Sequence, residues 1–235
     1  MQRVLVLVIT LLVFATPALA GQFGPATPLV QPGQFALGLG VFSYSDDWDF
    51  EAFTTDARQT QIFTQATLGL FSRWESYLRL GLADLRVDGA IGGSSFRDDY
   101  QPYGTVGIKG LFRQGSYLDF GGFAEGSYFM DYEDSAGSAK LEVDDALAVN
   151  AGLIFQMEIE GALLYAGPFF HYREADFSYR NPGGTPAAFS GTAESDSNFG
   201  GFLGIRWPVA KDLAIEAEVQ LRDKVSAGAA VSFLF

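Results

Sequence analysis

Apolar and polar residues alternate with a period of two along much of the chain. The clearest stripe lies near the carboxyl end, where one face reads Leu213, Ile215, Ala217, Val219 and Leu221 and the other reads Ala214, Glu216, Glu218, Gln220 and Arg222. Successive side chains of a β-strand point to opposite faces, whereas a helix needs a period near 3.6. The pattern therefore predicts strands with one apolar and one polar face.

Ten segments of this kind follow one another from residue 34 onward. Most of them have about the 9 to 11 residues that a tilted strand needs to cross a bilayer. The predicted strands are 34–45, 60–71, 76–86, 101–112, 116–129, 145–157, 162–174, 197–207, 213–222 and 225–235. Eight or twelve strands are the alternatives, because 34–45 and 162–174 have ragged edges.

The connections between these segments alternate in length. They are short near Arg73, Gln114, Glu160 and Val209 and long after the first, third, fifth and seventh segments. Transmembrane barrels have short periplasmic turns and long outer loops, a rhythm that a secreted β-sandwich does not need. The expected fold class is therefore all-β, a closed antiparallel up-and-down transmembrane β-barrel of ten strands, in the bacterial outer membrane with both termini periplasmic.

The amino-terminal end has the features of an export signal. Residues 1–20 combine Arg3, an apolar run and the small-residue site Ala18-Leu19-Ala20, and the run is too short for a membrane-spanning helix. We expect cleavage after Ala20. Residues 21–33, with three prolines, are then expected to form a periplasmic lead-in, with a small plug as the alternative, and 34–235 the barrel.

Aromatic residues support the membrane interpretation, because outward-facing aromatic side chains of such barrels gather at the two water interfaces. Those at the predicted periplasmic ends are Phe112, Phe155, Trp207 and Phe235, and those near the outer ends are Tyr128, Phe170, Tyr172 and Phe199.

The last residues, Val231-Ser232-Phe233-Leu234-Phe235, resemble the terminal strand of bacterial outer-membrane proteins, which ends in a carboxy-terminal phenylalanine. The resemblance implies that Phe233 and Phe235 are read by the barrel-assembly machinery. It identifies a class of small outer-membrane β-barrels and no subfamily.

Composition limits the partners. The formal net charge is −13 and cysteine is absent, so nucleic acid is an unexpected partner and disulfides are excluded. Residues 46–58 and 131–143 form two acidic outer loops. Their spacing could offer oxygen ligands to divalent cations, from Asp47, Asp49 and Glu51 in the first loop and from Asp131, Glu133 and Asp134 in the second. A solvated acidic loop is the simpler interpretation. Outer-membrane lipid and lipopolysaccharide are the other expected partners.

The parity of the stripes assigns ten ionisable residues to the barrel interior. They are Arg79, Lys109, Asp119, Glu125, His171, Arg173, Arg206, Glu216, Glu218 and Arg222. We expect Lys109 to pair with Asp119 and Arg206 with Glu216. Since an eight-stranded barrel is filled by side chains and open porins have about sixteen strands or more, we expect a largely filled interior.

This interior predicts a structural or surface-interaction role, with a narrow passive channel for small solutes or ions as the alternative. A hydrolase or lipid-modifying enzyme ranks third, since His171 is the single histidine and no nucleophile has a matching spacing. The ten-stranded omptin proteases do not match residue by residue, because the outer loops here are shorter and only His171 is available for their Asp-His pair. The lipid A deacylases do not match either, because their His-x-Ser reads His171-Tyr172-Arg173 here. We expect no enzyme activity, cofactor or metal.

Overall fold

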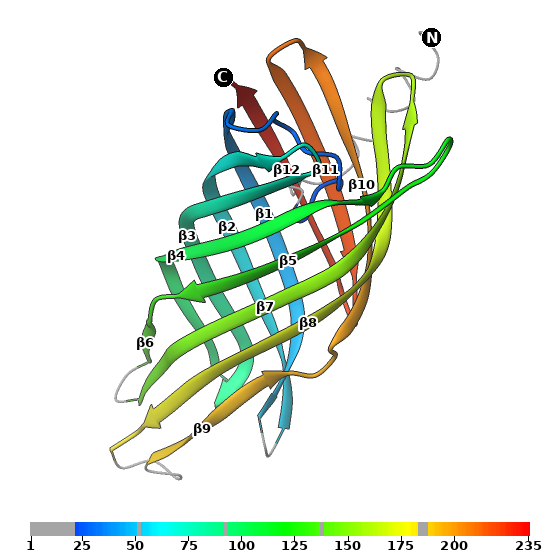
Figure 1. Ribbon diagram of the computed structural model, residues 1–235. Helices are drawn as coiled ribbons and strands as arrows, with labels where there is room; N and C mark the ends of the chain where they lie inside the picture. Colours follow the sequence, from blue (N-terminus) through cyan, green and yellow to red (C-terminus); the bar gives the residue numbers. More distant parts are fainter. Residues whose placement is uncertain (1–21, 51–52, 92–93, 137–138, 183–187) are drawn as a thin grey trace, which may run out of the picture.

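The computed structural model describes residues 22–50, 53–91, 94–136, 139–182 and 188–235 (Figure 1). The predicted signal peptide, residues 1–20, lies outside this part of the chain. Within the described residues, no helix has the length and apolar character to cross a membrane.

The chain folds into one closed antiparallel barrel of ten strands, as predicted. The elements are β1 (Phe35–Phe50), β2 (Phe53–Phe71), β3 (Trp74–Ile91), β4 (Ser94–Arg113), β5 (Asp119–Phe129), β6 (Tyr132–Ala136), β7 (Ala139–Ile159), β8 (Ala162–Arg180), β9 (Ala188–Ser195), β10 (Phe199–Ala210), β11 (Leu213–Leu221) and β12 (Val225–Leu234). The short strands β6 and β9 continue β5 and β10 across breaks, because β5 and β6 both pair with β7, and β9 and β10 both pair with β8. Pairing of β12 with β1 closes the wall.

The two ends of the barrel differ, and Figure 1 shows them at opposite ends of the molecule. We call the end with the connections 72–73, 114–118, 160–161 and 211–212 the turn end, and the opposite end the hairpin end. The carboxyl terminus lies at the turn end. At the hairpin end the prediction of long loops was wrong, because β1 and β2 stay paired as far as Phe50 and Phe53.

The hairpin end continues as sheet because the apolar stripe changes face within single strands. In β3, Leu78, Leu80 and Leu82 are exposed on the outside of the barrel, whereas Leu85 and Val87 are buried inside it. The alternation is thus outward-apolar in one half of the strand and inward-apolar in the other. We call these the turn half and the hairpin half. The strands predicted from the sequence end near this change of face, because the prediction followed the outward-apolar alternation alone.

The outside of the turn half carries an apolar belt. Large exposed apolar residues lie on nearly every strand, including Leu39, Ile62, Leu80, Val106 and Leu203. A soluble monomer rarely exposes so much contiguous apolar surface, whereas a membrane barrel presents it to lipid. Aromatic side chains lie at its edge, where the ring of Phe120 contacts those of Phe112 and Phe155, each at a centroid distance of 5.3 Å.

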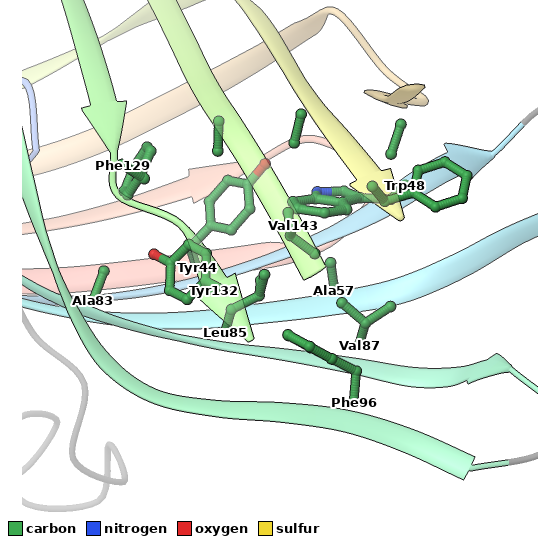
Figure 2. Close-up of a cluster of buried hydrophobic side chains, with 14 of the residues drawn as sticks. Tyr44, Trp48, Ala57, Ala83, Leu85, Val87, Phe96, Phe129, Tyr132 and Val143 are labelled. Atoms are coloured by element: carbon green, nitrogen blue, oxygen red, sulfur yellow. The ribbon is translucent and has the colours of Figure 1, made fainter. Parts of the chain in front are cut away.

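The inside of the hairpin half is an apolar core made by the strands themselves (Figure 2). Trp48, Leu85, Phe96, Tyr132 and Val143 come from five different strands and are all buried in one cluster. The wall also narrows here, because β9 pairs directly with β1 beyond the ends of β11 and β12. A wall with fewer strands leaves a lumen that side chains can fill.

Candidate functional site

The amino-terminal segment lies inside the turn half of the barrel, and we call residues 22–32 the plug. Phe23 is 1% exposed and its ring stacks on that of Phe123 with the centroids 4.1 Å apart. Its edge contacts are with Phe169 and Phe202, from β8 and β10. Prediction of a periplasmic lead-in was wrong, because isolated apolar side chains of this segment find a buried aromatic site within the lumen. The alternative of a small plug is what the structure shows.

Glu218 of β11 holds the first residues of the plug. The backbone N–H groups of Gln22, Phe23 and Gly24 all donate to its carboxylate, at distances of 3.2, 3.3 and 3.0 Å. Successive N–H groups can converge on one anion in this way only in a compact, nest-like backbone conformation. Gly24 supplies it with a φ of +72°, which residues other than glycine rarely adopt.

The carbonyl groups of the plug are bound by cations of the wall. Arg79 donates to the Gln22 carbonyl at 2.7 Å, Lys109 to the Phe23 carbonyl at 2.9 Å and Arg206 to the Thr27 carbonyl at 2.8 Å. The plug therefore satisfies both kinds of charge on the wall, since its N–H groups meet carboxylates and its carbonyls meet cations.

Most of the predicted interior charges are buried together in the turn half. Arg79 pairs with Glu125 at 3.6 Å, and Arg206 pairs with Glu216 at 2.5 Å. The predicted pair of Lys109 with Asp119 was wrong, because the five-residue connection 114–118 places Phe123 opposite Lys109. Lys109 pairs instead with its register partner Glu75, at 3.5 Å. Asp119 lies at the turn end and accepts from the N–H of Gly115 at 3.1 Å.

The other predicted interior charges lie where the turn half meets the hairpin half. His171 is buried, with its Nδ1 2.7 Å from Asn150 Oδ1 and its Nε2 3.2 Å from the Tyr44 hydroxyl. Asp46, which we had assigned to an acidic loop, is buried and accepts from Tyr44 at 2.5 Å and pairs with Arg222 at 3.1 Å. Both imidazole nitrogens are thus engaged by side chains of the wall.

Arg173 lies beside this network and faces three rings. Its guanidinium carbon is 5.2 Å from the ring centroid of Tyr44, 5.0 Å from that of Trp48 and 4.7 Å from that of Phe129. Cation–π contacts of this kind stabilise a desolvated guanidinium. The side chain reaches from β8 toward β1 and β5 and so occupies the lumen between them.

Little space remains beside the inner part of the plug. A cavity next to Gln22 and Phe23 measures about 10 Å³, room for one water molecule. A larger cavity of about 330 Å³ lies at the turn end, against Thr27, Pro28 and Leu29. No group of three or more histidine, cysteine or carboxylate residues in the described ranges is arranged to hold a metal ion. The divalent-cation site therefore stays a prediction, and its candidate Glu51 lies outside those ranges.

Comparison with known proteins supports the architecture. No family model and no curated protein matches the sequence. The translocator domain of autotransporter NalP from Neisseria meningitidis is similar in structure, with a TM-score of 0.54, 11% identity, and coverage of 87% of this chain and 90% of that chain. The outer membrane protease OmpT from Escherichia coli has a TM-score of 0.46 and 11% identity, with coverage of 86% of this chain and 95% of that chain. The outer membrane protein OprG from Pseudomonas aeruginosa has a TM-score of 0.44 and 15% identity, with coverage of 90% of this chain and 99% of that chain. Likeness at such identities concerns the fold alone: the chain has the fold of the bacterial outer-membrane β-barrels.

Proposed function

We propose that this protein is a closed, non-conducting barrel of the bacterial outer membrane, with a structural and surface-interaction role. The turn end faces the periplasm and the hairpin end faces outward. The observation that carries the proposal is the plug, because Phe23 fills the lumen at 1% exposure and the surrounding charges are bonded to plug backbone.

The hairpin half supports the same function independently. Its lumen is filled by an apolar core from the wall strands, so a solute that passed the plug would meet a second barrier of different chemistry. Ions cross an apolar core poorly because they lose hydration without gaining partners.

The outer surface of the hairpin half supports the interaction role. Glu174 of β8 lies directly opposite Glu194 of β9, which in turn lies opposite Asp49 of β1. Asp144 of β7 lies opposite Asp176 of β8. Like charges in opposite register destabilise a sheet unless a cation lies between them. This acidic face therefore favours divalent cations, including those that neutralise lipopolysaccharide, or a basic partner.

Planar-bilayer recording tests closure. The intact barrel gives no steady conductance, whereas a variant that lacks residues 22–32 and also carries Trp48→Ala and Tyr132→Ala gives stepwise conductance, because the plug and the apolar core of the hairpin half are then both opened. Tyr117→Ser is the matched control, since this side chain is 91% exposed in the connection 114–118 and should leave the barrel silent. Steady conductance from the intact barrel would contradict the proposal.

That contrary result would favour a second candidate, a narrow channel gated by the plug. The cavity of about 330 Å³ beside Thr27, Pro28 and Leu29 favours it, because this part of the plug has room to move.

The acidic face is tested by cation-dependent stability. Ca²⁺ or Mg²⁺ should raise the unfolding midpoint of the intact barrel in phosphate-free detergent. The variant Glu174→Gln, Asp176→Asn, Glu194→Gln should lose most of this rise. An equal rise in both proteins would remove this face as the cation site.

A further inference from the structure

Arg173 is an interior arginine whose hydrogen-bonding groups the wall leaves largely unused. The residue is 3% exposed, and its Nε and Nη2 are buried without a hydrogen-bond partner in the described part of the chain. The third nitrogen, Nη1, lies 3.5 Å from Gln59 Oε1, at the outer limit of a hydrogen bond. Buried donors are normally bonded, because one left without an acceptor loses its hydration and gains nothing in return.

Arg79 shows what the same two nitrogens do when an acceptor is present. The N–H of Nε and one N–H of Nη2 leave the same edge of the planar guanidinium in parallel and form a fork that suits an anionic or carbonyl acceptor. In Arg79 both nitrogens donate to Gln65 Oε1, at 3.2 and 3.0 Å. The corresponding edge of Arg173 has no such acceptor among the described residues.

The acceptors near Arg173 already have other partners. Gln59 Oε1 accepts from Gln61 at 2.9 Å. Asp46 is the buried carboxylate of this network, and Arg222 pairs with it at 3.1 Å. Arg173 and Arg222 therefore place two guanidinium groups beside the single carboxylate of Asp46.

We propose that the Nε and Nη2 edge of Arg173 binds one buried chloride ion, which balances the second guanidinium of this network. Chloride carries one charge and has no fixed lone-pair directions, so two parallel N–H groups can hold it. Sulfate or phosphate would leave further oxygens without donors, because the guanidinium lies among the rings of Tyr44, Trp48 and Phe129 (Figure 2). The site goes beyond the proposed function, since it requires the folded barrel and not its closure.

Thermal unfolding in different anions tests the site. The barrel is refolded into detergent micelles in sodium chloride or in sodium gluconate at the same concentration, so that the ionic strength is equal. Gluconate is too large for a filled lumen. At about ten times its Kd, chloride should raise the wild-type midpoint by roughly 3 to 6 °C above that in gluconate, because it binds the folded state alone.

Arg173→Met removes the fork and leaves an apolar side chain among the rings, so its midpoint should be the same in both salts. Leu85→Ala is the matched control. Leu85 is 1% exposed in the core of the hairpin half, so its truncation destabilises the barrel but keeps the fork, and the rise in chloride should remain. The site is overturned if the wild type shows no rise specific to chloride, if Arg173→Met keeps the rise, or if Leu85→Ala loses it.

Crystals of the wild-type barrel grown in sodium bromide locate the ion without any variant. An anomalous peak in contact with Nε and Nη2 of Arg173 is the expected result. A water molecule at this edge, or bromide at exposed cations alone, would overturn the site and leave an adventitious ion only. Bilayer conductance bears on neither result, so failure of the chloride site and failure of the proposed closure are distinguishable.

Discussion

The turn half and the hairpin half exclude water from one continuous lumen by opposite means. In the turn half the apolar side chains face outward, so the inward positions are polar. Arg206 there pairs with Glu216 and donates to the plug, and Glu218 accepts from N–H groups of the plug. In the hairpin half the polar side chains face outward and the inward side chains form an apolar core. Whether lipid or water lies outside the wall decides which chemistry can fill the inside.

This difference between the two halves indicates that the turn half needs a plug because lipid surrounds it. A strand has two faces. Where its apolar face contacts lipid, its polar face points into the lumen and cannot form a dry core unless its polar groups find partners. Backbone groups of an inserted segment supply such partners. In the hairpin half the polar face contacts water, so the apolar face fills the lumen and no inserted segment is needed.

The largest expected effect breaks an ion pair of the turn half. Arg206→Met leaves Glu216 buried without its partner at 2.5 Å and removes a bond to the Thr27 carbonyl. Urea unfolding in vesicles should show a loss of about 3 to 5 kcal/mol, because a buried charge is left uncompensated. Adding Glu216→Leu should restore most of it. A small loss in the single variant would mean that water reaches this pair.

These charges also show how far the sequence can predict the site. Period-two parity assigned Arg79, Lys109, Arg206, Glu216 and Glu218 to the interior, because outward-apolar alternation is strongest in the turn half. Glu75 was missed since the third strand was begun at residue 76, although it lies on the same face as Tyr77 and Arg79. Register set the partner of Lys109, and register depends on the length of connection 114–118, which parity does not supply.

The plug and the hairpin half were less predictable for physical reasons. A segment such as 22–32 has no period, since its backbone is bonded to wall side chains rather than to a neighbouring strand. Its isolated Phe23 and Val30 were the available signal. In the hairpin half the apolar stripe changes face, as from Leu82 to Leu85. A pattern that assumes one constant apolar face therefore assigns Asp46 to a solvated loop, although its side chain is buried.

The next effect tests the change of face within β3. Leu85→Ala should cost about 3 kcal/mol, because a side chain that is 1% exposed leaves a cavity in the core of the hairpin half. Leu80→Ala on the same strand should cost clearly less, since lipid can occupy the vacated space. Urea unfolding of both variants in vesicles measures the contrast, and equal losses would refute the change of face.

A smaller effect concerns the outer surface of the same strand. Leu80→Arg should cost about 2 kcal/mol in vesicles, because a guanidinium placed in the apolar belt must reach the interface. Arg86 lies on the same outward face beyond the belt and is exposed, so Arg86→Leu should change the unfolding free energy little. If Arg86→Leu instead stabilises the barrel clearly, the belt extends further along β3 than the burial pattern indicates.

The smallest effect is a pH dependence at the exposed surface of the hairpin half. The pKa of Glu142 is lowered from its ordinary value of 4.5, chiefly because Lys140 donates a hydrogen bond to it at 2.5 Å. A carboxyl whose pKa is lower in the folded state stabilises the fold above its unfolded pKa and loses this contribution as the pH falls through the folded value. The window therefore lies below 4.5. Both side chains are partly exposed, so solvent screening keeps the effect small.

Unfolding midpoints of the wild type and of Lys140→Met, followed as the pH is lowered from neutral, measure this contribution. The two midpoints should differ slightly at neutral pH and converge as the pH falls below 4.5 and through the lowered pKa of Glu142 in the folded wild type. A difference that persists at low pH would show that Lys140 acts through packing. A steep fall of both midpoints together would instead assign the acid sensitivity to groups away from this pair.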